Sequence, residues 1–165
     1  MDNAKFGGMF TCNGGSLGAG INPELKWTGA PAGAMSFVIT FIDTTLGADN
    51  AMGQHWAMYN IPATVTELPQ GGAIKTPTGT LSTTKQATPL NNGFLAPCAQ
   101  SDTSKTADDK YEFTVYALST ASLTLSTDTS VKGVLTALGV LPSGTLAASV
   151  LAHATIHAHA GYKGM

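Results

Sequence analysis

The chain has 165 residues, of which 43% are hydrophobic and only 11% are charged. This composition is too apolar for a disordered chain, and the length fits a single domain over residues 1–165. The formal net charge is −2 and every cationic side chain is a lysine, so we expect no nucleic-acid partner. A phosphate site would have to use backbone N–H groups, lysine or histidine, because no guanidinium is available.

Targeting signals and cysteines bear on the compartment. No run of about 18 apolar residues is present, so we expect no integral membrane contact. The first residues, Met1–Lys5, lack the apolar segment of a signal peptide, which leaves a cytosolic protein or a mature exported one. Cys12 and Cys98 could close one long loop in an oxidising compartment, worth about 3–5 kcal/mol; the alternative is two unconnected thiols. This pair favours a periplasmic or secreted location over the cytoplasm.

Three runs predict β-strands. Ser36–Asp43 is rich in β-branched and aromatic residues, and His55–Ile61 is stopped by Pro62. Tyr111–Leu118 alternates, with Tyr111, Phe113 and Val115 on one face and the residues between them on the other.

The last third of the chain is mixed. Ser122–Leu125 predicts a shorter strand, and Asp128–Leu138 predicts a helix that its first residue or Ser130 can cap and Gly139 can close. Ser149–His159 fits either a helix or a strand, and we expect it to begin as helix and end as strand. The fold class is therefore mainly β, an antiparallel sandwich with one or two late helices.

Three of the four histidines lie in the last run. On a strand, His153, His157 and His159 project from one face together with Thr155. Imidazoles grouped in this way can bind Zn, Cu or Ni ions. The alternative is a polar, solvent-facing strand edge, with the intervening alanines and Ile156 facing the core.

The fourth histidine, His55, opens a strand soon after Asp43 closes the preceding one. If these strands pair, the two side chains lie close together near one end of the sheet. A carboxylate there can orient an imidazole and favour its charged form. The alternative is a histidine at the edge of the core that is satisfied by structural hydrogen bonds.

Motifs of common enzymes are missing from the sequence. It contains no Gly-x-Ser-x-Gly elbow, no His-Glu-x-x-His and no phosphate loop of the Gly-x-x-x-x-Gly-Lys-Ser/Thr type. We therefore expect no catalytic residues, no cofactor and no enzymatic activity.

Several segments, in order along the chain, resemble motifs of the phosphatidylethanolamine-binding protein family, in its bacterial Raf-kinase-inhibitor-like branch. They are Asn22–Trp27, Gly29–Gly33 followed by Ser36–Val38, His55–Trp56 with Tyr59–Ala63, Asn92–Gly93 with Ala96–Cys98, and Tyr111–Leu118. The tail, Ser149–Tyr162, fits more loosely. The resemblance implies a β-sandwich with a large central sheet and a small pocket for phosphate-like anions or phospholipid head groups. It places Asp43, His55, Pro97 and Tyr111 at that pocket.

The sequence departs from the family pattern at the pocket. The Asp-Pro-Asp-x-Pro motif has become Asp43–Gly47, which lacks the second carboxylate and both prolines, and His-Arg-Tyr has become Asp109–Tyr111. Asp109 adds negative charge where an anion should sit, and like charges a few ångströms apart cost on the order of several kcal/mol at an effective dielectric near 20. Asp43, His55 and Asp109 would therefore suit a cation or a neutral polar ligand.

Three functions follow as expectations. The first is a non-enzymatic module that binds a small anionic or polar ligand in a diverged pocket. The second is an inhibitor or protein-interaction module, of the kinase- or protease-modulator type, which acts on a protein partner through the loops Gln70–Thr88 and Gln100–Asp108. The third is a metal-binding protein or hydrolase that uses the terminal histidines. A homodimer is compatible with the low surface charge.

Overall fold

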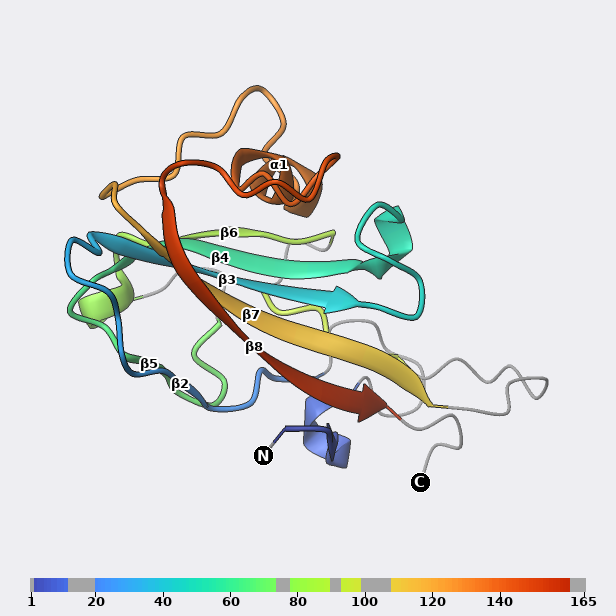
Figure 1. Cartoon of the computed structure of the whole chain (residues 1–165). Coiled ribbons are helices and arrows are strands. Elements are labelled where there is room, and N and C mark those ends of the chain that lie inside the picture. Colours follow the sequence, from blue (N-terminus) through green and yellow to red (C-terminus); the bar gives the residue numbers. More distant parts are fainter. Residues whose placement is uncertain (1, 12–19, 74–77, 90–92, 99–107, 161–165) are drawn as a thin grey trace.

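The computed structural model describes residues 2–11, 20–73, 78–89, 93–98 and 108–160. Its main feature is a six-stranded sheet with the strand order β1-β8-β7-β3-β4-β6 (Figure 1). The strands are β1 Ala4–Lys5, β3 Ser36–Asp43, β4 Gln54–Pro62, β6 Lys85–Ala87, β7 Asp109–Leu118 and β8 Val150–Ala160. Neighbours run antiparallel except β1, which runs parallel to β8. A two-stranded sheet pairs β2 Leu25–Lys26 with β5 Glu67–Leu68. The predicted fold class is confirmed.

The sheet separates two hydrophobic cores. One face carries an aromatic core that includes Phe41, Trp56 and Phe113, and the small sheet β2–β5 lies on this side. The opposite face packs against the helix α1, Val131–Ala137. Because β3 is covered on both sides, all eight of its residues are buried. The described chain also contains 3₁₀ turns at η1 Gly8–Phe10, η2 Ala51–Gly53 and η3 Gly79–Leu81.

The helix forms where the sequence predicts it, although it is shorter. The side chain of Ser130 accepts a hydrogen bond from the backbone N–H of Gly133 and so caps the N-terminus. Gly139, with a φ of 79°, follows Leu138, the residue that caps the C-terminus of the helix. This left-handed conformation costs glycine little, which is why glycine so often ends helices.

Two predictions about strands are wrong. Ser122–Leu125 is not a strand: the backbone N–H of Leu123 donates to Oδ1 of Asn60 at 2.8 Å instead of to a neighbouring strand. The run from residue 149 does not begin as a helix either, because β8 is one continuous strand paired with β7 along its length. Of the described helices, none is long and apolar enough to cross a membrane.

Candidate functional site

The candidate site lies where β3 ends, β4 begins and β7 begins. Asp43, the last residue of β3, is in register with Tyr111 on β7, and Ile42 is in register with Gln54, the residue before His55. Asp43, His55, Asp109 and Tyr111 are 3, 7, 7 and 2% exposed, respectively. Antiparallel pairing on both sides of β3 therefore gathers four polar side chains in a buried position.

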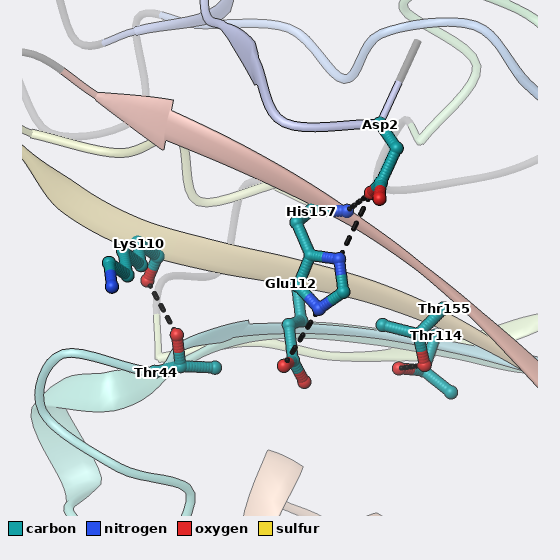
Figure 2. A network of polar contacts seen from close by, with 7 residues as sticks. All are labelled: Asp2, Thr44, Lys110, Glu112, Thr114, Thr155 and His157. Atoms are coloured by element: carbon teal, nitrogen blue, oxygen red, sulfur yellow. Dashed lines mark hydrogen bonds and ion pairs between the residues drawn. The ribbon is translucent and has the colours of Figure 1, made fainter.

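The turn after Asp43 is held by hydrogen bonds. Oδ1 of Asp43 accepts from the backbone N–H groups of Thr45 and Leu46 at 2.8 and 3.3 Å. The hydroxyl of Thr44 donates to the carbonyl of Lys110 at 3.2 Å (Figure 2). The backbone N–H of Thr44 donates to the same carbonyl at 2.8 Å. The N–H of Lys110 in turn donates to Oγ1 of Thr45 at 2.8 Å. The two threonines thus tie this turn to the first residues of β7.

A close backbone approach also shapes this turn. A Cβ atom at Gly53 would collide with the carbonyl oxygen of Gly47 and crowd that of Asp43. The segment before β4 can therefore pass against the turn only because residue 53 is a glycine.

His55 is held by its backbone and ring neighbours. Its Nδ1 lies 3.2 Å from the carbonyl oxygen of Leu95, so the proton on Nδ1 is donated and Nε2 is left as an acceptor in the neutral ring. The ring packs edge-on against Phe41 and Tyr111, with centroids 5.3 Å away in both cases. Burial lowers the pKa of His55, while the Leu95 carbonyl and the charges of Asp43 and Asp109 oppose that shift.

Tyr111 remains a phenol in this environment. Its pKa is raised by burial first, then by the negative charges of Asp43 and Asp109, and by a hydrogen bond with Asp43. The same two carboxyl groups thus act on the imidazole and on the phenol, which places the predicted set Asp43, His55, Asp109 and Tyr111 in one electrostatic unit. Their role in ligand binding stays a prediction.

The remaining predicted residues lie around this unit or outside the described chain. Pro97 is buried and lies two residues after Leu95, whose carbonyl oxygen accepts the hydrogen bond from His55. Cys98 is disulfide-bonded. Cys12 lies outside the described residues, so the pairing of Cys12 with Cys98 stays a prediction.

The three terminal histidines share a sheet face, as predicted, but have different partners. His157 lies between two carboxylates, with Nδ1 3.0 Å from Asp2 Oδ1 and Nε2 3.3 Å from Glu112 Oε1 (Figure 2). His153 instead stacks on Tyr116, with ring centroids 5.9 Å apart. Within the described ranges, no three His, Cys, Asp or Glu side chains converge to hold a metal ion. The geometry therefore gives no support to a metal site on His153, His157 and His159.

The opposite face of β8 faces the core only in part: Ala160 is 1% exposed and Ala158 packs against the aromatic core, as predicted, whereas Ile156 does not. Ile156 is 44% exposed and lines an apolar groove with a cavity of about 260 Å³, which also touches Trp27 and Phe113. The groove lies between the segment Leu25–Thr28 and the strands β7 and β8, so this segment leaves Ile156 uncovered. Alternation in the sequence cannot reveal how far a covering layer extends.

Comparison with known proteins assigns the family. A family model described as phosphatidylethanolamine-binding protein matches residues 1–156. The chain belongs to this family. Among its relatives, the UPF0098 protein YbhB of Escherichia coli (strain K12) is 35% identical over 104 residues, which cover 61% of each chain. The UPF0098 protein YbcL of the same organism is 31% identical over 128 residues, or 73% of this chain and 63% of YbcL. The matches thus span about three fifths of the length of these curated relatives.

Solved structures of the family agree with the fold. The crystal structure of E. coli YbcL, described as a member of the mammalian PEBP family, superposes with a TM-score of 0.71 at 26% identity. The superposition covers 99% of this chain and 94% of YbcL. A phosphatidylethanolamine-binding protein homologue from Chlamydia trachomatis gives a TM-score of 0.65 at 21% identity over 96% of this chain and 90% of its own. The second likeness shows the fold alone.

Proposed function

We propose that the chain is a non-enzymatic binding module of its family whose site takes a small organic cation or a neutral polar group in place of an anion. The observation that carries this proposal is the burial of Asp109, at 7% exposure, where its charge acts on both His55 and Tyr111. Asp109 stands at the position where the resemblance places a pocket histidine.

The charge of the site favours a cation. Asp43 and Asp109 contribute two carboxyl groups, and burial lowers the pKa of His55, so that the ring adds no positive charge at neutral pH. A phosphate would meet like charges, each costing about 4 kcal/mol at a separation of about 4 Å and an effective dielectric of about 20. An ammonium group, by contrast, can donate to the carboxylates and to Nε2 of His55.

The family description suggests a concrete probe. Phosphatidylethanolamine, which the family description names, has a head group that joins an ammonium to a phosphate. An acidic site suits the ammonium end of such a molecule. Ethanolamine therefore presents the ammonium group alone, and inorganic phosphate presents the phosphate group alone.

An amide NMR titration with ethanolamine at pH 7 tests the proposal. Saturable shifts centred on Asp43, His55 and Tyr111 are expected, and Asp109→Asn should weaken the affinity about tenfold because it removes a charge-assisted contact. Asp49→Asn is the matched control, since Asp49 is an exposed carboxylate in the loop after Asp43. Unchanged ethanolamine affinity in Asp109→Asn would contradict the proposal.

An interaction module that acts through the loops Gln70–Thr88 and Gln100–Asp108 stays a prediction, because residues 74–77 and 100–107 lie outside the described part of the chain. Limited proteolysis tests it. Rapid cleavage in both loops without loss of ethanolamine binding would favour interaction surfaces. A homodimer and an exported location also stay predictions.

A further inference from the structure

The N-terminal strap, defined as residues Asp2–Phe6, lies along the end of β8 (Figure 1). The N–H of Asn3 donates to the carbonyl of His157 at 2.9 Å, and that of Phe6 donates to the carbonyl of His159 at 2.8 Å. Strand β1 itself has only two residues. So short a strand is weakly held by its backbone alone, and the side chains of the strap decide how firmly it docks.

The first anchor is at Asp2. Its Oδ1 accepts from the backbone N–H of His157 at 2.7 Å and lies 3.0 Å from Nδ1 of the same residue (Figure 2). On its other side, His157 Nε2 faces Glu112 of β7 at 3.3 Å. Each ring nitrogen of His157 thus faces a carboxylate, and the ring links the strap through β8 to β7.

Other charged groups near this anchor are few in the described chain. Lys110 and His159 are in register one step along the same sheet face, and Lys5 is in register with His159. Lys5 Nζ lies 3.6 Å from Asp108 Oδ2, at the residue before Asp109. This second ion pair joins the strap to the start of β7.

The strap also reaches the candidate site through Phe6, which is 7% exposed. Its ring meets those of Phe41 and Tyr111 edge-on, with centroids 5.9 Å away in both cases. It meets Phe113 edge-on at 6.2 Å. Tyr111 is therefore packed from one side by His55 and from another by the strap.

We propose that the strap positions Tyr111, and that the Asp2–His157–Glu112 latch controls this positioning. Docking of the strap and ligand binding at the site then stabilise one another, because coupling between two sites is reciprocal. The ligand-binding arm rests on the function proposed above. Phe6 and His157 act here as positioning residues, since neither belongs to the site itself.

Hydrogen exchange in the full chain tests the latch without any ligand. His157→Gln should lower the protection factor of the Phe6 amide about two- to five-fold, the scale expected for losing one exposed charged contact. His153→Gln is the matched control, because His153 lies on the same face of β8 but stacks on Tyr116. Equal protection in wild type and His157→Gln would overturn the latch.

Ligand binding tests the coupling. Ethanolamine should raise the protection factor of the Phe6 amide, and Phe6→Leu should weaken ethanolamine affinity about fivefold or more while shifting the ring resonances of Tyr111. If ethanolamine binds at Asp43 and His55 but leaves Phe6 exchange unchanged, the coupling is wrong and the proposed function stands. If ethanolamine does not bind, the proposed function fails. In that case, exchange of the Phe6 amide in wild type and His157→Gln still tests the latch. The ring resonances of Tyr111 in Phe6→Leu still show whether the strap positions Tyr111.

Discussion

His55 and Tyr111 meet edge to face, with ring centroids 5.3 Å apart and ring planes at 89°. They belong to β4 and β7, which are not neighbours in the sheet but flank β3. Phe41 of β3 contacts both rings, at 5.3 and 5.4 Å. The site thus spans three strands and rests on the aromatic core. Its polar groups are therefore fixed by core packing rather than by a loop.

His55 should make the fold less stable at acidic pH. Because burial lowers its pKa below the usual value of about 6.5, its contribution to stability is present above pH 6.5 and is lost as the pH falls through the lowered pKa. Ring NMR should give a titration midpoint below 6.5. Urea denaturation at pH 7.5 and 5.0 should show a smaller loss in His55→Gln than in wild type, with His153→Gln behaving as wild type. A midpoint at or above 6.5 would argue against the buried environment.

Tyr111 should make the fold less stable at alkaline pH. Its pKa is raised by burial and by the charges of Asp43 and Asp109, so the folded protein keeps a proton that the unfolded chain releases near pH 10. Its contribution to stability is full below pH 10 and falls above it. Urea denaturation at pH 9 and 10.5 should show a smaller loss in Tyr111→Phe than in wild type. Tyr59→Phe is the comparison: burial alone raises the pKa of Tyr59, and an equal effect in that variant would contradict the role of the two carboxylates.

Phe41 should be one of the most sensitive core positions. It is fully buried and stacks on Phe113 with ring centroids 4.2 Å apart. Phe41→Ala should lower the free energy of unfolding by about 3–5 kcal/mol, measured by chemical denaturation. Met52→Ala serves as control, since Met52 is 72% exposed and should change stability by less than about 0.5 kcal/mol. If Phe41→Ala lowers the free energy of unfolding by less than about 1 kcal/mol, the aromatic core is not packed as described.

Replacing Gly133 with alanine should destabilise the protein, which is the opposite of what helix propensity predicts. Alanine in a helix interior is normally better than glycine by about 1 kcal/mol. A Cβ atom at Gly133, however, would collide with the carbonyl oxygen of Asp128. Gly133→Ala should therefore destabilise the protein by about 1–3 kcal/mol in thermal or urea denaturation, while Lys132→Ala on the exposed side should be nearly neutral. A stabilised Gly133→Ala variant would contradict the close approach at this turn.

Much of the fold could be predicted from local patterns. Strand β3 coincides with the predicted run Ser36–Asp43, and β4 and β7 extend the predicted runs by one or two residues at one or both ends. These strands are central and strongly apolar, so the spacing of their apolar residues and their composition both predict a strand. The proximity of Asp43 and His55 could also be predicted, because two antiparallel strands joined by a short connection bring the end of one beside the start of the next.

The less predictable features depend on contacts distant in sequence. Thr44 and Thr45 look like ordinary turn residues until β7 brings Lys110 against them. The partners of His157 come from Asp2 and Glu112, more than 40 residues away. Residues 122–125 have strand propensity, but the backbone N–H of Leu123 donates to the side chain of Asn60 and not to a neighbouring strand.

We propose that Asp109 makes the site prefer a cation to an anion. To test this, inorganic phosphate is titrated into wild type and Asp109→His at pH 6, and the amides of Asp43, His55 and Tyr111 are followed by NMR. We predict no saturable shifts in wild type at millimolar phosphate and a clear gain of binding in Asp109→His. Phosphate binding to wild type at these amides, as tight as in Asp109→His, would show that Asp109 does not exclude anions.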